Sequence, residues 1–156
     1  LGRVIAEYNR LAPPDVLVCF SNSGNNAATV DMALAAHEMG LPVIAFTNVE
    51  YASQLTTQHS SGKKLKDIAD VVIDNCSVIG DAAIQLDGLE VKVGATSTIP
   101  VVYLLAGLLA QTCENLLEQG ITPDVYYNGH LAYERDDVKE HNDALVDKYY
   151  RRMRNL

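Results

Sequence analysis

Three short apolar runs, separated by segments with helical spacing, constrain the fold of this chain more than any other feature. The runs occupy residues 16–20, 43–47 and 71–74. They are apolar at nearly every position, which is typical of strands buried on both faces. Between the first two runs, apolar residues at helical spacing predict a helix over residues 26–39, ended by Gly40. This alternation predicts an α/β fold, a three-layer αβα sandwich built on a parallel sheet.

The remaining segments add helices and one irregular stretch. Helical spacing predicts helices over residues 1–11, 98–119 and 136–155, and a short helix over 64–69 after a polar loop. The helix at 98–119 is apolar almost all round, so its centre should be buried. Residues 75–97 show no period, and a long irregular stretch of this kind usually lines a site or an interface.

The length of 156 residues suits a single domain over residues 1–156. Three strands are few for a sheet of this type, and Leu1 falls within a helical pattern. We therefore expect that the chain lacks N-terminal strands of the complete domain. The final helix, within residues 136–156, is a candidate for packing on a partner subunit.

Composition argues against several classes of function. The net charge of −8 argues against non-specific binding to nucleic acid or to an anionic membrane surface. The longest apolar run, residues 99–110, is too short to span a bilayer. The cysteines Cys19, Cys76 and Cys113 are widely spaced and form no C-x-x-C motif, so we interpret them as small buried residues of a cytoplasmic protein. We expect no metal and no cofactor.

Two turns rich in hydroxyl and amide side chains carry the chemistry. One follows the strand at 16–20, and the other opens the helix at 98–119. Such turns point free backbone N–H groups at one place, and the helix dipole adds to their attraction for phosphate. The alternative is that these side chains only cap helices, which suffices for either turn alone. The two turns together, with Gly24 allowing close approach, favour ligand binding. The candidate ligand-binding residues are Ser21, Asn22, Ser23, Gly24, Asn25, Asn26, Thr96, Ser97 and Thr98.

The sequence Ser21-x-Ser23-Gly24-Asn25-Asn26 after a buried strand, followed much later by Thr96-Ser97-Thr98, resembles the SIS (sugar isomerase) domain. The likeness covers most of residues 15–120. Its part from Asp70 to Thr98 resembles uncharacterised bacterial SIS proteins related to phosphoheptose isomerases and N-acetylmuramic acid 6-phosphate etherases. The resemblance implies a flavodoxin-like parallel sheet, a sugar phosphate held by its phosphate at the two turns, and a homo-oligomer (dimer or tetramer).

Isomerisation of an aldose to a ketose needs a base that moves a proton between neighbouring carbons and an acid that opens the ring. The catalytic candidates are His59, Glu114 and His141. Each has a simpler alternative, namely a solvated turn for His59, the exposed end of the apolar helix for Glu114, and a charged helix surface for His141. His141 is retained because the resemblance to SIS isomerases implies a histidine from a late segment, sometimes of a neighbouring subunit.

The sequence therefore indicates a phosphosugar-binding protein that acts as a sugar-phosphate isomerase or lyase. The alternatives are a non-catalytic sensor of sugar phosphates and a dimerisation module. Residues 59–64 end like a P-loop, but Thr57 stands where that motif needs glycine, and neither G-x-G-x-x-G nor G-x-S-x-G occurs. Nucleotide-binding and hydrolase assignments therefore lack support.

Overall fold

The computed structural model describes residues 1–130 and 135–150 of the chain. The chain divides into two compact units, Leu1–Gly107 and Leu108–Leu156. The boundary between them falls inside the longest helix, α4 (Thr98–Glu118).

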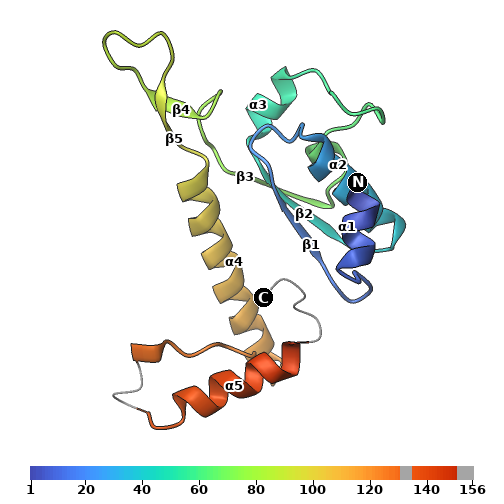
Figure 1. Cartoon of the computed structure of the whole chain (residues 1–156), viewed down its shortest axis with the longest axis vertical. Coiled ribbons are helices and arrows are strands. Elements are labelled where there is room, and N and C mark those ends of the chain that lie inside the picture. Colours follow the sequence, from blue (N-terminus) through green and yellow to red (C-terminus); the bar gives the residue numbers. More distant parts are fainter. Residues whose placement is uncertain (131–134, 151–156) are drawn as a thin grey trace. The chain divides into compact units, whose positions relative to one another are not determined.

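The first unit contains a three-stranded parallel sheet. Its strands β1 (Leu17–Phe20), β2 (Val43–Thr47) and β3 (Val71–Asp74) are hydrogen-bonded in the order β1-β2-β3 (Figure 1). Cys19 pairs with Ala45, which pairs in turn with Val72. The three predicted strands and their parallel arrangement are confirmed. β2 is the central strand, and it is the most deeply buried because it has a neighbour on each side.

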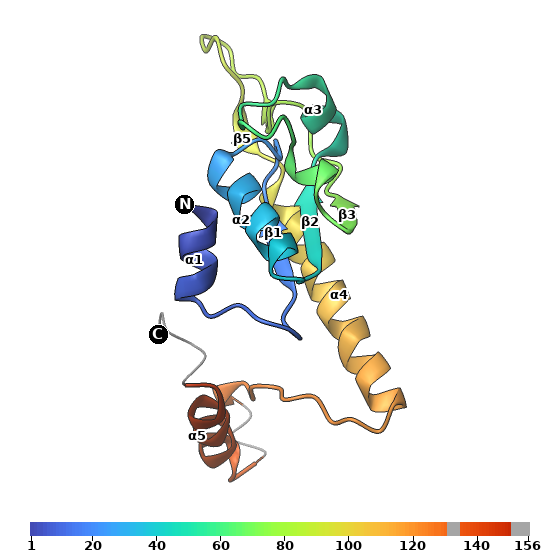
Figure 2. The same cartoon turned by 90° about the vertical axis from the view of Figure 1, so that its right-hand side faces the viewer.

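Two helices lie side by side over one face of this sheet, α1 (Gly2–Tyr8) and α2 (Ala27–Glu38) (Figures 1 and 2). The Asn26 side chain caps α2 by accepting a hydrogen bond from the Ala28 N–H at 3.0 Å. The helix ends before Gly40, whose φ of 76° lies in the left-handed region that suits glycine after a helix. The predicted second helix is confirmed within one residue at each end.

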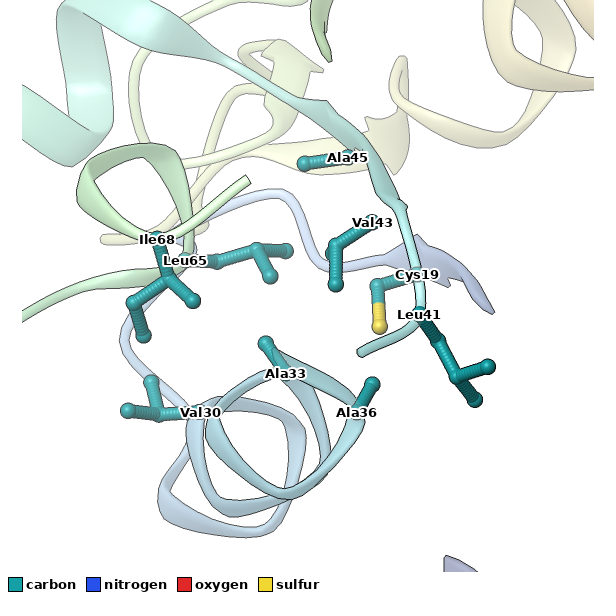
Figure 3. Packing of buried hydrophobic residues seen from close by; sticks show 9 residues of the cluster. All are labelled: Cys19, Val30, Ala33, Ala36, Leu41, Val43, Ala45, Leu65 and Ile68. Atoms are coloured by element: carbon teal, nitrogen blue, oxygen red, sulfur yellow. The ribbon is translucent and has the colours of Figure 1, made fainter. Parts of the chain in front are cut away.

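The hydrophobic core lies between α2 and the sheet. Small and branched side chains of α2 face those of the strands, and a 3₁₀ turn, η1 (Leu65–Asp67), adds the fully buried Leu65 (Figure 3). Burying a side chain of that size contributes about 1.5–3 kcal/mol. The cluster comprises Cys19, Val30, Ala33, Ala36, Leu41, Val43, Ala45, Leu65 and Ile68.

Three short elements were absent from the sequence prediction. α3 (Val49–Gln54) lies in the expected polar loop, and β4 (Ala82–Ile84) pairs antiparallel with β5 (Val93–Ala95) in the stretch expected to be irregular. Strands of three residues are too short to show a period of two, and six residues make less than two helical turns. Periodicity therefore could not detect them.

Helix α4 begins and ends close to its predicted bounds, but the predicted burial is wrong. None of its residues is buried within the described part of the chain. A helix that is apolar all round needs neighbours on every side, and the described residues do not supply them. Its 21 residues and mean hydropathy of 1.3 would allow it to cross a membrane, judged by length and composition alone. One such helix is weak evidence, because core helices of soluble proteins meet the same criteria.

The second unit contains helix α5 (Val138–Tyr149) and the segment before it. The buried Asn142 side chain bonds both backbone groups of Tyr127, accepting from its N–H and donating to its carbonyl, each at 2.9 Å. The helix was expected over residues 136–155, and its last part, residues 151–156, lies outside the described residues.

The cysteines do not share one environment. Cys19 is buried in the core, and this burial raises the pKa of its thiol. Cys113 is half-buried, whereas Cys76 is exposed. The expectation that all three are buried is therefore wrong for Cys76, which follows β3 in a left-handed backbone conformation with a φ of 51°.

Candidate functional site

A pocket of about 240 Å³ lies at the carboxyl ends of the strands in the first unit. Parallel strands bring their carboxyl ends to one edge of a sheet, and ligands of α/β proteins bind outside that edge. One part of its wall is polar and the other is apolar, and no lining side chain is charged. The pocket is lined by Phe20, Ser21, Asn22, Phe46, Asn75, Ser97, Thr98, Val101 and Val102.

The two hydroxyl-rich turns meet at this pocket. Ser21 and Asn22 follow β1 directly, and the Ser21 N–H donates to the Phe46 carbonyl at 3.0 Å, which ties the turn to β2. Ser97 and Thr98 reach the same pocket from the beginning of α4. The chain therefore places two turns that are about 75 residues apart in sequence around one cavity.

A network of amides and hydroxyls fixes the Asn22 side chain. Its Oδ1 accepts from Asn75 Nδ2 at 3.0 Å and from Ser77 Oγ at 2.7 Å. The Asn75 Oδ1 accepts from the Ser77 N–H at 3.1 Å, so the orientation of the Asn75 amide is set by its neighbours. Asn48, at the N-cap of α3, donates to both oxygens of Ser77.

This network leaves one donor unused. The Asn22 Nδ2 is buried and has no hydrogen-bond partner among the described residues. An unsatisfied buried donor costs about 1–3 kcal/mol, and such groups are often completed by a ligand or by solvent. The residue that carries this donor also lines the pocket.

The remaining residues of the first turn are engaged in holding the turn itself. The buried Asn25 donates to the Thr56 carbonyl at 2.8 Å and accepts from the Gln58 N–H at 3.0 Å. The Ser23 Oγ accepts from the Asn25 N–H at 3.3 Å. These contacts match the interpretation in which part of the turn serves only local structure. Of the nine predicted binding residues, Ser21, Asn22, Ser97 and Thr98 line the pocket, whereas Ser23, Gly24, Asn25, Asn26 and Thr96 are not part of its lining.

The Asp81 carboxylate accepts hydrogen bonds from two backbone amides of the second turn. The Thr96 and Ser97 N–H groups both donate to Asp81 Oδ1, at 3.0 and 2.8 Å, and the Thr96 hydroxyl donates to the Asp81 carbonyl at 2.7 Å. Partial desolvation raises the pKa of Asp81, but the hydrogen bonds from Ser97 and Thr96 outweigh it and lower that pKa overall.

The catalytic candidate His59 is held inside its own loop. Its Nε2–H donates to Asp31 Oδ1 at 2.9 Å, because a carboxylate can only accept. Its Nδ1 therefore accepts, from the Ser61 N–H at 3.1 Å and from the Ser61 hydroxyl at 2.8 Å. His59 is almost buried and is not among the residues that line the pocket.

The other two catalytic candidates belong to the second unit. Glu114 is exposed on α4 and accepts from Gln111 Nε2 at 2.6 Å. His141 stacks on Tyr127, with ring centroids 3.8 Å apart, and its Nε2–H donates to the Val125 carbonyl at 2.9 Å. Among the described residues, no group of three or more His, Cys, Asp or Glu could hold a metal ion.

Sequence analysis left several residues of this region out of the candidate site. Asn75 directly follows β3 at the same edge as Ser21, so its position along the chain was a usable signal. Phe20 and Phe46, which stack with centroids 5.0 Å apart, have the ordinary pattern of core strand residues. Asp81 could not have been found, because its partners lie about 15 residues further along the chain.

Comparison with known proteins gives one family model and a set of similar bacterial proteins. Residues 1–48 match the model of the SIS domain. The UPF0309 protein of Caldanaerobacter subterraneus subsp. tengcongensis is 35% identical over 156 residues, covering 99% of this chain and 62% of the relative. A UPF0309 protein of Listeria innocua is 36% identical over 139 residues, covering 89% of this chain and 55% of the relative. The chain thus spans about three fifths of the length of the curated relatives it matches.

Proposed function

Because residues 1–48 carry a SIS domain, we propose that this chain binds a phosphorylated monosaccharide in the pocket at the sheet edge, with the phosphate at the start of α4. The observation that carries the proposal is the meeting of two separate turns at one pocket. Ser21 comes from the end of β1, and Thr98 comes from the start of α4. The sugar would lie between them.

The start of α4 suits an anion without help from lysine or arginine. The first N–H groups of a helix have no partner within the helix, and the dipole places partial positive charge there. α4 is 21 residues long and opens at the pocket. Within the described part of the chain, the hydroxyls of Ser21 and Thr98 have no hydrogen-bond partner, so both could donate to a phosphate.

The remaining wall suits a single sugar ring. A cavity of about 240 Å³ is smaller than the roughly 300–1,000 Å³ of pockets that hold drug-sized ligands. The exposed ring of Phe20, which stacks on the buried Phe46, offers an apolar surface to the C–H face of a sugar. The polar side chains of the lining can bond the sugar hydroxyls. An amino sugar or a heptose derivative fits this description.

For the whole protein, we propose aldose–ketose isomerisation or elimination on such a sugar phosphate. Either reaction needs a group that moves a proton, and the pocket lining of this chain contains no titratable side chain. The base would come from outside the lining, and His59, Glu114 and His141 stay the candidates. A sensor that binds the same ligand without chemistry is the second candidate function, and it is favoured by the uncharged lining.

The proposal extends to architecture. A flavodoxin-like, three-layer αβα sandwich would place further structure on the sheet face opposite α1 and α2. The exposed apolar side chains of α4 would then be covered in a cytoplasmic homo-oligomer. Support comes from the parallel sheet with helices on one face and from the apolar surface of α4.

Removal of one hydroxyl tests the binding proposal. Thr98→Val keeps the shape of the side chain but removes the hydroxyl expected to bond the phosphate, so the affinity for hexose 6-phosphates should fall by about 10- to 100-fold. Isothermal titration calorimetry with hexose, aminohexose and heptose phosphates measures this affinity. Thr112→Val is the matched control in the same helix, because its hydroxyl donates to the Leu108 carbonyl at 2.7 Å. Equal affinity in the wild-type and Thr98→Val proteins would remove the start of α4 from the site.

NMR spectroscopy of the same sugar phosphates separates the two functions. The full-length protein is incubated with each ligand, and the spectra are followed for ketose or elimination products. Product formation supports the enzyme. Ligand-dependent stabilisation without any product supports the sensor.

A further inference from the structure

Three side chains outside the pocket lining are joined in series by hydrogen bonds. The His59 Nε2–H donates to Asp31 Oδ1 at 2.9 Å, and the His59 Nδ1 accepts from the Ser61 hydroxyl at 2.8 Å. Asp31 lies on α2, whereas His59 and Ser61 lie in the loop between α3 and η1. A nucleophile within hydrogen-bond reach of a base, with the base held by a third group, is the arrangement of an activated hydroxyl.

The Asp31 carboxylate sets the ring of His59 in the form that can act as a base. An ionised carboxylate only accepts, so in the neutral ring Nε2 carries the hydrogen and Nδ1 keeps its lone pair toward Ser61. Hydrogen bonds, that from His59 first, lower the pKa of Asp31 to about 2, which keeps it ionised. The His59 side chain is only 11% exposed, so water competes little for Nδ1.

The Ser61 hydroxyl is accessible, and its oxygen receives a backbone donor. Ser61 is exposed, and no atom lies within 4 Å of the place where Gly62 would carry a Cβ, so a small electrophile has room to approach. The Lys63 N–H donates to Ser61 Oγ at 3.2 Å. Such a donor stabilises the negative charge that develops on the oxygen as its proton leaves.

The segment 59–64 resembles the end of a P-loop, but its amides are used within the protein. The Ser61 N–H donates to His59 Nδ1 at 3.1 Å, and the Gly62 N–H donates to the His59 carbonyl at 3.0 Å. The Lys64 N–H donates to Asp67 Oδ2 at 2.9 Å. These bonds leave no row of free amides for a phosphate, and they hold Ser61 against His59.

We propose that Ser61 is a nucleophile activated by His59 and Asp31, and that it takes acyl groups from small activated esters. The Ser61 Oγ bonds to the ester's carbonyl carbon while its proton passes to His59 Nδ1. The ester C–O bond then breaks, and the departing alcohol takes that proton. Water, deprotonated by the same nitrogen, hydrolyses the acyl-serine to the acid and restores the hydroxyl. The chain lacks G-x-S-x-G, but such a group is defined by its geometry and not by a sequence motif.

Covalent labelling of the full chain tests the nucleophile. A fluorophosphonate, which phosphonylates activated serines with loss of fluoride, should add one group to the wild-type protein, and peptide mass spectrometry should place it on Ser61. Ser61→Ala should not react. Ser60→Ala removes the neighbouring exposed hydroxyl and is the matched control, so it should react like wild type. Release of p-nitrophenol from p-nitrophenyl acetate follows the acyl step in the same proteins.

Substitution of the two supporting residues tests the activation. His59→Gln removes the base and should slow labelling by about 100-fold. Asp31→Asn should also slow it, because an amide can donate as well as accept and no longer fixes the hydrogen on Nε2. Asp31→Glu restores a carboxylate and should recover most of the rate, which a merely structural role of Asp31 would not produce. Circular dichroism checks that each variant is folded.

The outcomes decide between activation and a structural turn. Labelling of Ser61 that depends on His59 supports the inference. Absence of label on Ser61 in the wild-type protein, or equal rates for wild type and folded His59→Gln, would show that the three side chains only stabilise the loop, and would overturn it. Because Ser61 does not line the pocket, Ser61→Ala should bind hexose 6-phosphates like wild type. The sugar-phosphate proposal is therefore tested separately.

Discussion

Asp31 shows how a single side chain joins distant segments of this chain. Its carboxylate accepts from the His59 Nε2–H at 2.9 Å, from the N-terminal ammonium at 3.2 Å and from the Gly2 N–H at 3.4 Å. These donors, with His59 contributing most, lower the pKa of Asp31 to about 2. The residue thereby connects α2 to both α1 and the loop after α3.

The acid sensitivity of the fold should depend on Asp31. The pKa of an unfolded aspartate is about 3.9, so ionised Asp31 stabilises the folded state above about pH 4. This contribution is lost as the pH falls towards about 2. Urea unfolding across this range should show a smaller loss of stability for Asp31→Asn than for wild type. Asp87→Asn should follow wild type, and a wild-type-like profile for Asp31→Asn would refute the prediction.

Gly24 lies in the first turn at a position where an added side chain would be strained. Its φ is 60°, and an added Cβ would lie 3.1 Å from Thr47 Oγ1, a hydroxyl that donates to the Asn22 carbonyl. Gly40 has a similar φ of 76° but no neighbour within 4 Å. Gly40→Ala should therefore cost about 1 kcal/mol, and Gly24→Ala should cost more. Denaturant unfolding measures both free energies, and equal costs would mean that the contact with Thr47 is unimportant.

At the scale of elements, two asparagine caps differ in what they hold. Asn26 caps α2 and is exposed, whereas Asn48 caps α3, is buried, and also donates to Ser77. The first cap serves one helix. The second also connects α3 to the network around Asn22.

Alanine and aspartate substitutions should separate these roles. Asn26→Ala should cost about 1 kcal/mol and Asn48→Ala about 2 kcal/mol or more, because the second also removes the donor to Ser77. Aspartate retains the capping oxygen but not the Nδ2 donor. The free energy of unfolding of Asn26→Asp should therefore equal that of wild type, whereas that of Asn48→Asp should be lower. Thermal and denaturant unfolding of the four variants measure these free energies. Wild-type stability of Asn48→Asp would contradict the role of the Asn48 donor.

At the scale of the whole molecule, α4 exposes several large apolar side chains that no described residue covers. Its side chains Ile99, Tyr103 and Leu109 are between 56 and 79% exposed. Monomeric soluble proteins rarely expose large contiguous apolar patches. The homo-oligomer proposed above would cover it.

Molar mass in solution tests the proposed association. Light scattering after size-exclusion chromatography should show an oligomer for the wild-type protein and a smaller species for Leu109→Lys, because a charge would be buried in the apolar contact. Gln119→Lys adds the same side chain beyond the last residue of α4 and should leave the mass unchanged. A wild-type monomer, or an unaltered mass for Leu109→Lys, would exclude α4 as the contact.

The sequence by itself determined the elements that depend on local patterns. Continuous apolar runs identified β1, β2 and β3, and helical spacing with Asn26 and Gly40 placed α2. The same patterns indicated a parallel sheet, and the two polar turns resembled those of a SIS domain, whose model matches residues 1–48. These features are visible because backbone preference and the alternation of burial act over neighbouring residues.

Only the tertiary structure shows which of these residues lie close together in space. It places Ser21 and Thr98 in the lining of the pocket, whereas the Asn25 side chain bonds the loop backbone instead. It also brings the Asp81 carboxylate within hydrogen-bond distance of the Thr96 and Ser97 amides. It also left α4 uncovered within the described residues, although its composition predicted burial. Each of these results depends on contacts between segments far apart in sequence, and no local pattern of propensity or period encodes such contacts.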